Sequence, residues 1–414
     1  MKIQNSRYIL SLMVFLSLIL CCIGACSADN PYIHEYDSEN NTVINSSYNL
    51  THGQGFGLIA SSNITLDFEN NTLNSLNEFS KALVSSNEDN NYTNITIKNL
   101  VLTNFTEGIY LNYIDNLKLV NVKSINSTNP IYISNSDNLV VENCEFINCS
   151  TGLKIKNISN SEIKNCLFNL SKYGLNNTLD LNNSVIDSCV FTNGVLGIMF
   201  ETNTIYNITN NTFKNNKFIN NSEYSIYCDE FKECENNTLE NNEFINCTYY
   251  TVVFIGTGDS YFNHNDIKNN KFMNIYNLEN SWNGCAIKVE STTIENMAIT
   301  NNTINNCSDC GMYICEECIG TNNTISQNTI SNCRDGISLE TTGVHIYLNN
   351  LQNNRYAISP YSVSSNYPHS PIMTFAYNGK SYTGRLGNYY GEDLGDSNNG
   401  IYVKPQGGIG VVPR

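Results

Sequence analysis

The chain has 414 residues, with 22 basic against 38 acidic side chains and a formal net charge of −16 at pH 7. An acidic chain without clusters of lysine and arginine is poorly suited to nucleic-acid phosphates or anionic membrane surfaces, so we expect no nucleic-acid partner. Asparagine dominates the composition, but 41% hydrophobic and 11% aromatic residues are too many for a disordered asparagine-rich tract. The composition therefore indicates a folded protein.

The N-terminus has the features of an export signal. Lys2 and Arg7 precede an apolar run over residues 8–20, and small residues follow this run. The run is too short to cross a bilayer comfortably and no other long apolar stretch occurs, so we predict a signal peptide at 1–28 and no membrane span. Cleavage after Ala28 would release a secreted protein, whereas the segment ending at Cys26 also fits a lipobox, in which Cys26 would be acylated. Both alternatives place the protein at the cell surface or in the extracellular space.

A repeat of about 22 residues becomes clear after the first quarter of the chain. Segments starting at Asn94, Asn116 and Asn138 read NITIKN, NLKLVN and NLVVEN, and each leads to a short apolar segment such as GIYL or PIYI. Longer copies start at Asn210 and Asn236, which open NNTFKNNKFIN and NNTLENNEFIN. The chain is therefore an array of similar units with insertions between them.

Each copy contains three short segments in which apolar and polar residues alternate with the period of a strand. Asn, Gly, Ser and Asp separate the segments and favour tight corners, where equivalent asparagines could form amide ladders. Three strands and three corners make one coil of a parallel β-helix, and coils must stack to bury their apolar edges. We predict an all-β, right-handed, single-stranded parallel β-helix of about 10–12 coils over residues 61–360. Residues 29–60 would form an N-terminal cap, and residues 361–414 a C-terminal cap and tail.

Two segments carry a resemblance to known proteins. Residues 57–73, GLIASSNITLDFENNTL, resemble the opening coil of NosD-like periplasmic proteins, and residues 377–390, YNGKSYTGRLGNYY, resemble their closing motif. Similar β-helix repeats occur in polysaccharide lyases and in the Asn/Thr-rich adhesin-like proteins of methanogenic archaea. The resemblance implies the fold and export rather than an activity. The chain departs from the group at Tyr390, where tryptophan is usual, and in the reduced acidic stretch that follows.

Cysteines recur at equivalent corners, where we expect buried thiols, with disulfides as the alternative. The densest group is Cys307, Cys310, Cys315 and Cys318, whose two C-x2-C pairs have the internal spacing of zinc or iron–sulfur ligands. The gap between the pairs is shorter than in such sites, and residues 311–314 read as a strand that would hold the pairs apart. We therefore predict no metal site, with these four cysteines as the alternative.

Acidic residues follow the third strand of several coils, so stacking would align them in a ridge. The candidates for catalysis are Glu290, Glu316 and Glu340. Two carboxylates on neighbouring coils could reach the separation found in retaining glycosidases, or several could bind calcium. Acids at solvated strand ends need no such role, and neither a positioned lyase base nor the motifs of polygalacturonase-like hydrolases occur. We predict no catalytic residues and no cofactor, with calcium binding or a polysaccharide lyase or glycoside hydrolase as alternatives.

Tyrosine supplies the binding hypothesis. Tyr110 and Tyr132 occupy equivalent outward positions of successive third strands, and exposed tyrosine rings can stack on sugars while their hydroxyls stay hydrated. We predict a secreted or surface-displayed, adhesin-like binding protein that contacts glycans or other cell-surface components, rather than an enzyme.

Overall fold

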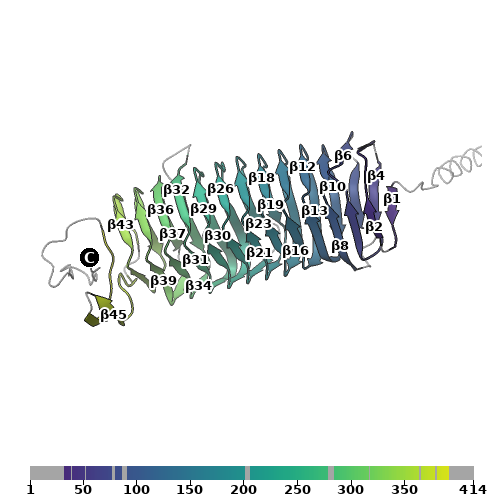
Figure 1. The fold of residues 1–414 in the computed structure, drawn as a ribbon. Helices are drawn as coiled ribbons and strands as arrows, with labels where there is room; N and C mark the ends of the chain where they lie inside the picture. Colours follow the sequence, from purple (N-terminus) through teal and green to yellow (C-terminus); the bar gives the residue numbers. More distant parts are fainter. Residues whose placement is uncertain are drawn as a thin grey trace, which may run out of the picture.

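The computed structural model describes residues 32–390, except for residues 39, 52, 77–79, 86–90, 201–205, 278–283, 317, 363–364 and 378–379. These residues contain no α-helix, and their strands form a long rod of stacked coils (Figure 1). The predicted signal peptide, including Cys26, lies outside the described residues. In the described part of the chain, no helix has the length and hydropathy needed to cross a membrane.

Nearly all strands belong to three parallel sheets, which we name A, B and C. Sheet B contains 13 strands: β2 Asn40–Val43, β5 Ile64–Asp67, β8 Tyr92–Lys98, β11 Ile114–Val120, β14 Val140–Glu142, β17 Glu162–Lys164, β21 Val185–Asp187, β25 Thr212–Lys214, β28 Thr238–Glu240, β31 Asp266–Lys268, β35 Ala298–Thr300, β39 Asn323–Ser326 and β42 Val344–Tyr347. Sheet C contains 13 strands: β3 Tyr48–Leu50, β6 Thr72–Ser75, β9 Val101–Thr103, β12 Lys123–Ile125, β15 Glu145–Ile147, β18 Leu167–Asn169, β22 Val190–Thr192, β26 Lys217–Ile219, β29 Glu243–Ile245, β32 Lys271–Ile275, β36 Thr303–Cys307, β40 Thr329–Ser331 and β43 Asn350–Gln352.

Sheet A is larger because several coils contribute two strands to it. Its 18 strands are β1 Tyr32–Tyr36, β4 Gly55–Ile59, β7 Lys81–Ser85, β10 Glu107–Asn112, β13 Asn129–Asp137, β16 Thr151–Ser159, β19 Tyr173–Asn177, β20 Leu181–Asn182, β23 Leu196–Phe200, β24 Tyr206–Thr209, β27 Ile226–Glu235, β30 Tyr250–Asn263, β33 Cys285–Glu290, β34 Thr293–Glu295, β37 Cys310–Glu316, β38 Ile319–Thr321, β41 Asp335–Glu340 and β44 Tyr356–Ile358. The antiparallel hairpin of β45 Met373–Tyr377 and β46 Lys380–Gly384 stands apart from the three sheets.

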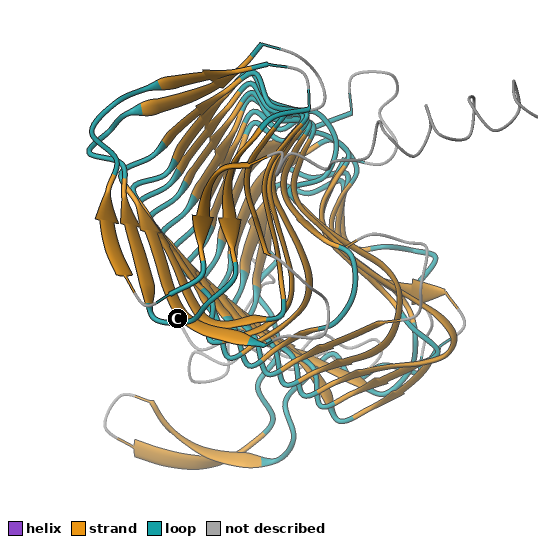
Figure 2. Cartoon of the chain, turned by 90° about the vertical axis from the view of Figure 1, so that its right-hand side faces the viewer, coloured by secondary structure: helices purple, strands orange, loops and turns teal. Residues whose placement is uncertain are grey.

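The predicted all-β parallel β-helix is confirmed. Seen from near the rod axis, the coils superimpose with their corners aligned (Figure 2). The helix begins earlier than the boundary at residue 61 that the repeat predicted, because β1, β2 and β3 already pair in parallel with β4, β5 and β6. With this opening coil, sheets B and C each have 13 described strands, which correspond to about 12 turns and agree with the predicted 10–12 coils.

The core follows from the alternation of side chains along each strand. The inward positions of sheet C form a column of six stacked rings, with centroids 4.6–4.9 Å apart and interplanar angles of 1–8°. The column consists of Phe146, Phe168, Phe191, Phe218, Phe244 and Phe272. Glycine opens the sheet A strand opposite these rings, since a Cβ on Gly174 would lie 2.6 Å from the Phe191 ring. The spacing between coils thus serves backbone pairing and ring stacking together.

The corners account for the abundance of asparagine. Most corner residues with a left-handed backbone are asparagines, such as Asn121 and Asn143 with φ of 53° and 54°. Asparagine adopts this conformation more readily than most side chains. On the surface its side-chain amide donates to an asparagine of the preceding coil, as Asn121 does to Oδ1 of Asn99 at 3.0 Å. The predicted amide ladders are therefore confirmed at these exposed corners.

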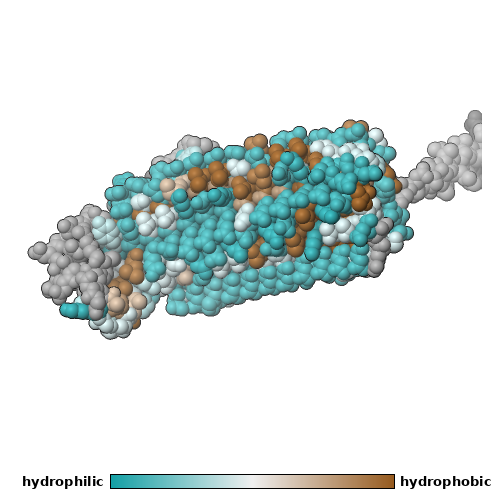
Figure 3. Space-filling view, in the orientation of Figure 1, coloured by the Kyte–Doolittle hydropathy of each residue, from teal (hydrophilic) through white to brown (hydrophobic). Residues whose placement is uncertain are grey.

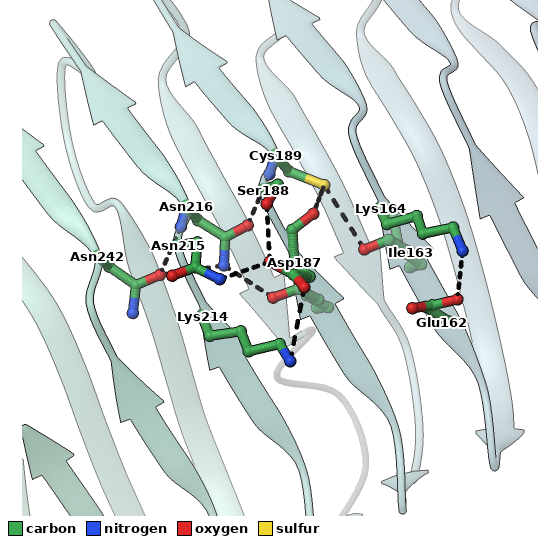
Figure 4. Close-up of polar contacts among 11 residues, drawn as sticks. Glu162, Ile163, Lys164, Asp187, Ser188, Cys189, Lys214, Asn215, Asn216 and Asn242 are labelled. Carbon is green, nitrogen blue, oxygen red and sulfur yellow. Dashed lines mark hydrogen bonds and ion pairs between the residues drawn. The ribbon is translucent and has the colours of Figure 1, made fainter.

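A second ladder is buried at the corner between sheets B and C. Each side-chain amide donates to the Oδ1 of the next asparagine over 2.9–3.1 Å along Asn216, Asn242, Asn270, Asn302, Asn328, Asn349 and Asn388. Figure 4 shows the start of this ladder, where the backbone N–H of Cys189 donates to Asn216. Each amide also donates to a backbone carbonyl of the preceding coil, such as that of Ile186 for Asn216. The ladder thus satisfies polar groups that the corner would otherwise bury unpaired.

The last coil is covered by the segment that resembles the NosD closing motif. Asn388 donates to the carbonyl of Ile346 and ends the buried ladder. Tyr389 forms a parallel bridge with Asn350, and the ring of Tyr390 packs against the core. This segment therefore pairs with the strand edge that the final coil would otherwise expose.

Candidate functional site

The outer face of sheet A carries one continuous row of equivalent side chains. In coil order the row is Tyr110, Tyr132, Lys154, Asn176, Met199, Tyr227, Val253, Lys288, Tyr313 and Ser338. Asn176 and Val253 in the middle of the row are buried, so accessible grooves lie toward its two ends. Figure 3 shows one side of the rod, on which hydrophobic patches alternate with hydrophilic ones above a hydrophilic lower edge.

We name the groove near the N-terminal end the tyrosine groove. It encloses about 300 Å³ across β10, β13, β16 and the residues that follow β19. Its lining consists of Glu107, Ile109, Tyr110, Asn129, Tyr132, Lys154, Lys156 and Thr178. The two tyrosines predicted to bind sugars therefore lie in one groove.

The two tyrosine rings form the apolar part of this groove. Their centroids are 4.8 Å apart and the ring planes are inclined by 35°, because Tyr110 and Tyr132 occupy paired positions of adjacent coils. Tyr110 is 36% exposed. The Nζ of Lys81 lies 5.0 Å from the centre of the Tyr110 ring and 3.2 Å from the Glu107 carboxylate. These contacts restrain the platform that the rings present.

We name the groove toward the C-terminal end the charged groove. It encloses about 340 Å³ over β30, β33, β37 and β41. Its lining consists of Tyr250, Lys288, Glu290, Asp309, Cys310, Tyr313, Arg334, Asp335, Ser338, Glu340, Ser359 and Tyr361. Two of the three glutamates predicted as catalytic candidates, Glu290 and Glu340, thus share this groove. Glu316 ends β37 and is paired with Glu340 in the strand register, but its side chain lies outside the described set.

Ion pairs organise the charged groove. One guanidinium nitrogen of Arg334 lies 2.5 Å from Asp309 and 3.2 Å from Asp335, so it holds two largely buried carboxylates side by side. Lys288 lies 2.9 Å from Glu290, and its ammonium stands 4.5 Å from the centre of the Tyr250 ring. Burial raises the pKa of Tyr250 far above its usual value, so this phenol stays protonated. The carboxylates of the groove can accept hydrogen bonds from sugar hydroxyls. Two neighbouring carboxylates are also the groups that glycoside hydrolysis uses.

Of the four cysteines considered as alternative metal ligands, Cys307 and Cys310 each contact a cysteine outside that set. The Sγ of Cys310 lies 3.1 Å from that of Cys285, Cys307 is hydrogen-bonded to Cys333, and Cys318 is disulfide-bonded. Nothing is described of the side chain of Cys315. Among the described residues, no group of three or more His, Cys, Asp or Glu side chains is placed to hold a metal ion.

The thiols of Cys285 and Cys310 should resist chemical modification in the folded protein. The hydrogen bond with Cys285, followed by burial, raises the pKa of Cys310, and burial raises the pKa of Cys285. A raised pKa lowers the fraction of reactive thiolate at pH 8, and burial also blocks the reagent. In freshly reduced protein we expect iodoacetamide to modify these two thiols at least tenfold faster after unfolding than before, as measured by peptide mass spectrometry. Rapid labelling of Cys310 in the native protein would contradict the closed packing beneath the charged groove.

Several residues of both grooves were not predicted from the sequence. Lys154 could have been predicted, because the segment GLKI places it at the same repeat position as Tyr110 and Tyr132. Lys156 follows two residues later on the same face of the strand. Asp309 and Arg334 lie outside the strands, next to β37 and β41, where no repeat pattern marks them.

Family comparisons match most of the described chain. A model described as the right-handed beta helix region matches residues 32–191 and 107–272, which together span more than half of the chain. A model described as periplasmic copper-binding protein (NosD) matches residues 279–395. No curated protein gives a significant match.

Solved structures with similar coils include proteins of different kinds. PfbA, a surface adhesin of Streptococcus pneumoniae, is 12% identical, with 86% of this chain and 92% of that chain covered and a TM-score of 0.47. A DFA-IIIase from Arthrobacter chlorophenolicus is 11% identical, with coverage of 70% and 86% and a TM-score of 0.45. The tailspike protein of E. coli bacteriophage HK620 is 11% identical, with coverage of 79% and 71% and a TM-score of 0.45. Identities of 11–12% do not carry a function from one chain to another.

The NosD description names copper, but the two histidines that the structure describes in the matched segment do not form a copper site. Copper favours imidazole, thiolate and thioether ligands. The rings of His345 and His369 are 6.3 Å apart, and a guanidinium nitrogen of Arg385 lies 2.7 Å from Nε2 of His369, where its charge would repel a cation. Two family models match the chain, and its strands form the parallel sheets of a β-helix. The chain therefore belongs to the right-handed β-helix family, with a NosD-like C-terminal region.

Proposed function

We propose that this β-helix is an exported, adhesin-like protein that binds glycans in the tyrosine groove. The observation that carries the proposal is the pair of tyrosine rings, 4.8 Å apart on adjacent coils and open to a groove of about 300 Å³. A sugar ring presents C–H groups on its face and hydroxyls around its edge, so it needs an apolar platform with polar groups beside it. Asn129 and Thr178 provide such polar groups in the same groove.

The proposal includes the cellular location of the protein. The basic and apolar start of the chain supports export, and the NosD-like region matches a family described as periplasmic. We propose an extracellular or surface location, with acylation of Cys26 as the route to anchoring. Mass spectrometry of the mature N-terminus tests this part, since a chain that starts at an acylated Cys26 is heavier than a chain that starts at Asp29 by the lipid and by the three residues 26–28.

Loss of the platform should weaken glycan binding. We expect Tyr110→Ala and Tyr132→Ala each to weaken retention on a bound polysaccharide about tenfold, which corresponds to ~1.4 kcal/mol. The measurement is affinity electrophoresis against a panel of plant, host and microbial polysaccharides. Tyr261→Ala is the matched control, because Tyr261 is 46% exposed and lies outside both grooves. Equal weakening by Tyr261→Ala, or none by the groove variants, would rule out this platform.

A second candidate function is a carbohydrate-active enzyme that uses the charged groove. The observation in its favour is that Glu290 and Glu340 share a groove with the carboxylate pair held by Arg334. The same polysaccharide panel, assayed for reducing or unsaturated ends with calcium and with chelator, separates the two functions. Retention without products supports binding alone. Release of products that Glu290→Gln abolishes would establish the enzyme, and loss of activity with chelator would add a calcium requirement.

A further inference from the structure

Two thiols meet at the charged groove. The Sγ atoms of Cys285 and Cys310 are 3.1 Å apart, which is only about 1 Å longer than a disulfide bond. Cys285 is the first residue of β33, and Cys310 is the first residue of β37. Both residues are buried and are free thiols in this structure. A small rotation of the two side chains would therefore bring the sulfur atoms to bonding distance.

The strand register holds the two cysteines side by side. β33 and β37 pair in parallel, with Ile287 opposite Met312. Two residues earlier on each strand, Cys285 therefore stands opposite Cys310. Neighbouring parallel strands lie about 4.8 Å apart, and disulfides accept Cα separations of about 4.4–6.8 Å. The backbone spacing thus permits a disulfide between these two coils.

Other buried thiols of the chain contact groups that cannot be oxidised with them. The Sγ of Cys247 lies 3.2 Å from the Oγ of Ser225. The Sγ of Cys234 lies 3.4 Å from the Nδ2 of Asn237. Such contacts satisfy a thiol as a hydrogen-bonding group. The contact of Cys285 with Cys310, in contrast, joins two groups that can be oxidised together.

The pair also has a defined place in the charged groove. Cys285 stands opposite Tyr250 of the preceding coil, and Cys310 stands opposite Asp335 of the following coil. Tyr250, Cys310 and Asp335 all line the groove. A bond between the two sulfur atoms would therefore connect β33 and β37, the two middle strands of the four that carry this groove.

We propose that Cys285 and Cys310 form a disulfide bond in the exported protein, which cross-links two successive coils beneath the charged groove. In this reaction two S–H bonds break and one S–S bond forms, while two electrons and two protons pass to a donor disulfide, which becomes two thiols. Compartments outside the cytoplasm supply such donors. The oxidising environment rests on the export in the proposed function, whereas the bond is independent of what either groove binds.

The bond forms while the two coils are still open. Thiol–disulfide exchange needs a thiolate that the donor can reach. In the closed coils the hydrogen bond with Cys285, followed by burial, raises the pKa of Cys310, and burial raises the pKa of Cys285. The folded protein therefore disfavours exchange in both directions, so a bond made during folding is retained.

The test locates the bond in protein exported to the periplasm of a bacterial host and in protein kept in its reducing cytosol. Each sample is denatured in iodoacetamide without reductant. Trypsin and glutamyl endopeptidase then cut the chain between Cys285 and Cys310 and between Cys310 and Cys333, and tandem mass spectrometry identifies linked peptides. We expect a link between Cys285 and Cys310 in most exported chains and two alkylated thiols in the cytosolic chains. Dithiothreitol should cleave the link at least tenfold more slowly in the folded protein than after unfolding.

Two variants and a second source of oxidised protein complete the test. Cys285→Ala should leave Cys310 alkylated. Cys149→Ala is the matched control and should leave the link intact, because the Sγ of Cys149 lies 3.8 Å from the Oγ of Ser124. Refolding of the cytosolic protein in a glutathione redox buffer repeats the test without export, so failure of the bond is distinguished from failure of export. Two alkylated thiols in this refolded protein, or a link from Cys310 to another cysteine, would overturn the proposal.

Discussion

Replacing Asn270 by alanine is expected to destabilise the β-helix by about 3–6 kcal/mol, because it leaves several buried polar groups unpaired at about 1–3 kcal/mol each. The Nδ2 of Asn270 donates to the carbonyl of Leu239 at 2.8 Å. Its Oδ1 accepts from the backbone N–H and the side-chain amide of Asn242, at 2.9 and 3.0 Å. Asn270 is only 1% exposed, so water cannot replace these partners.

The measurement is urea unfolding, followed by circular dichroism and read as the shift of the apparent midpoint. The control is Lys271→Ala, which changes the next residue, an exposed lysine on β32, and should shift stability by less than about 0.5 kcal/mol. Asn270→Asp keeps the shape and one acceptor but removes both donated bonds and buries a charge, so it should destabilise at least as much as alanine at neutral pH. If both variants lowered the free energy of unfolding by less than about 1 kcal/mol, the corner would be able to satisfy its polar groups without the asparagine ladder.

The fold was predictable where the repeat is regular. Between Asn94 and Ser159 each coil has nearly the same length, so equivalent residues lie a constant sequence step apart. That regularity placed Tyr110 beside Tyr132, and it would also have placed Lys154. In this part of the chain, contacts between coils follow from sequence spacing alone, because parallel in-register stacking converts equal positions into neighbours.

The charged groove could not be derived in the same way. Insertions of different lengths separate β30, β33, β37 and β41, and the register of sheet A shifts between Ile314 and Glu316. The predicted ridge of acidic residues therefore could not identify which side chains lie in the same groove. Asp309 and Arg334 also lie outside the strands, at corners whose side-chain directions depend on the local backbone rather than on a period of two.

Replacing Phe191 by alanine should lower the free energy of unfolding about as much as Asn270→Ala does, but by creating a cavity rather than by leaving polar groups unpaired. Phe191 lies between Phe168 and Phe218, with ring centroids 4.6 and 4.8 Å away and planes inclined by only 1° and 5°. It is 1% exposed, so Phe191→Ala leaves a cavity within the column. We expect a loss of about 3–5 kcal/mol.

Phe191→Leu is the matched variant, since it retains most of the buried apolar volume and should cost less than about 2 kcal/mol. Thermal unfolding of the two variants beside the parent separates volume from stacking. Because each coil contacts only its neighbours, the cavity should also raise hydrogen exchange in β18, β22 and β26 more than in β39, β40 or β41. Uniform exchange along the rod would contradict the local effect and would show that the β-helix opens as one cooperative unit.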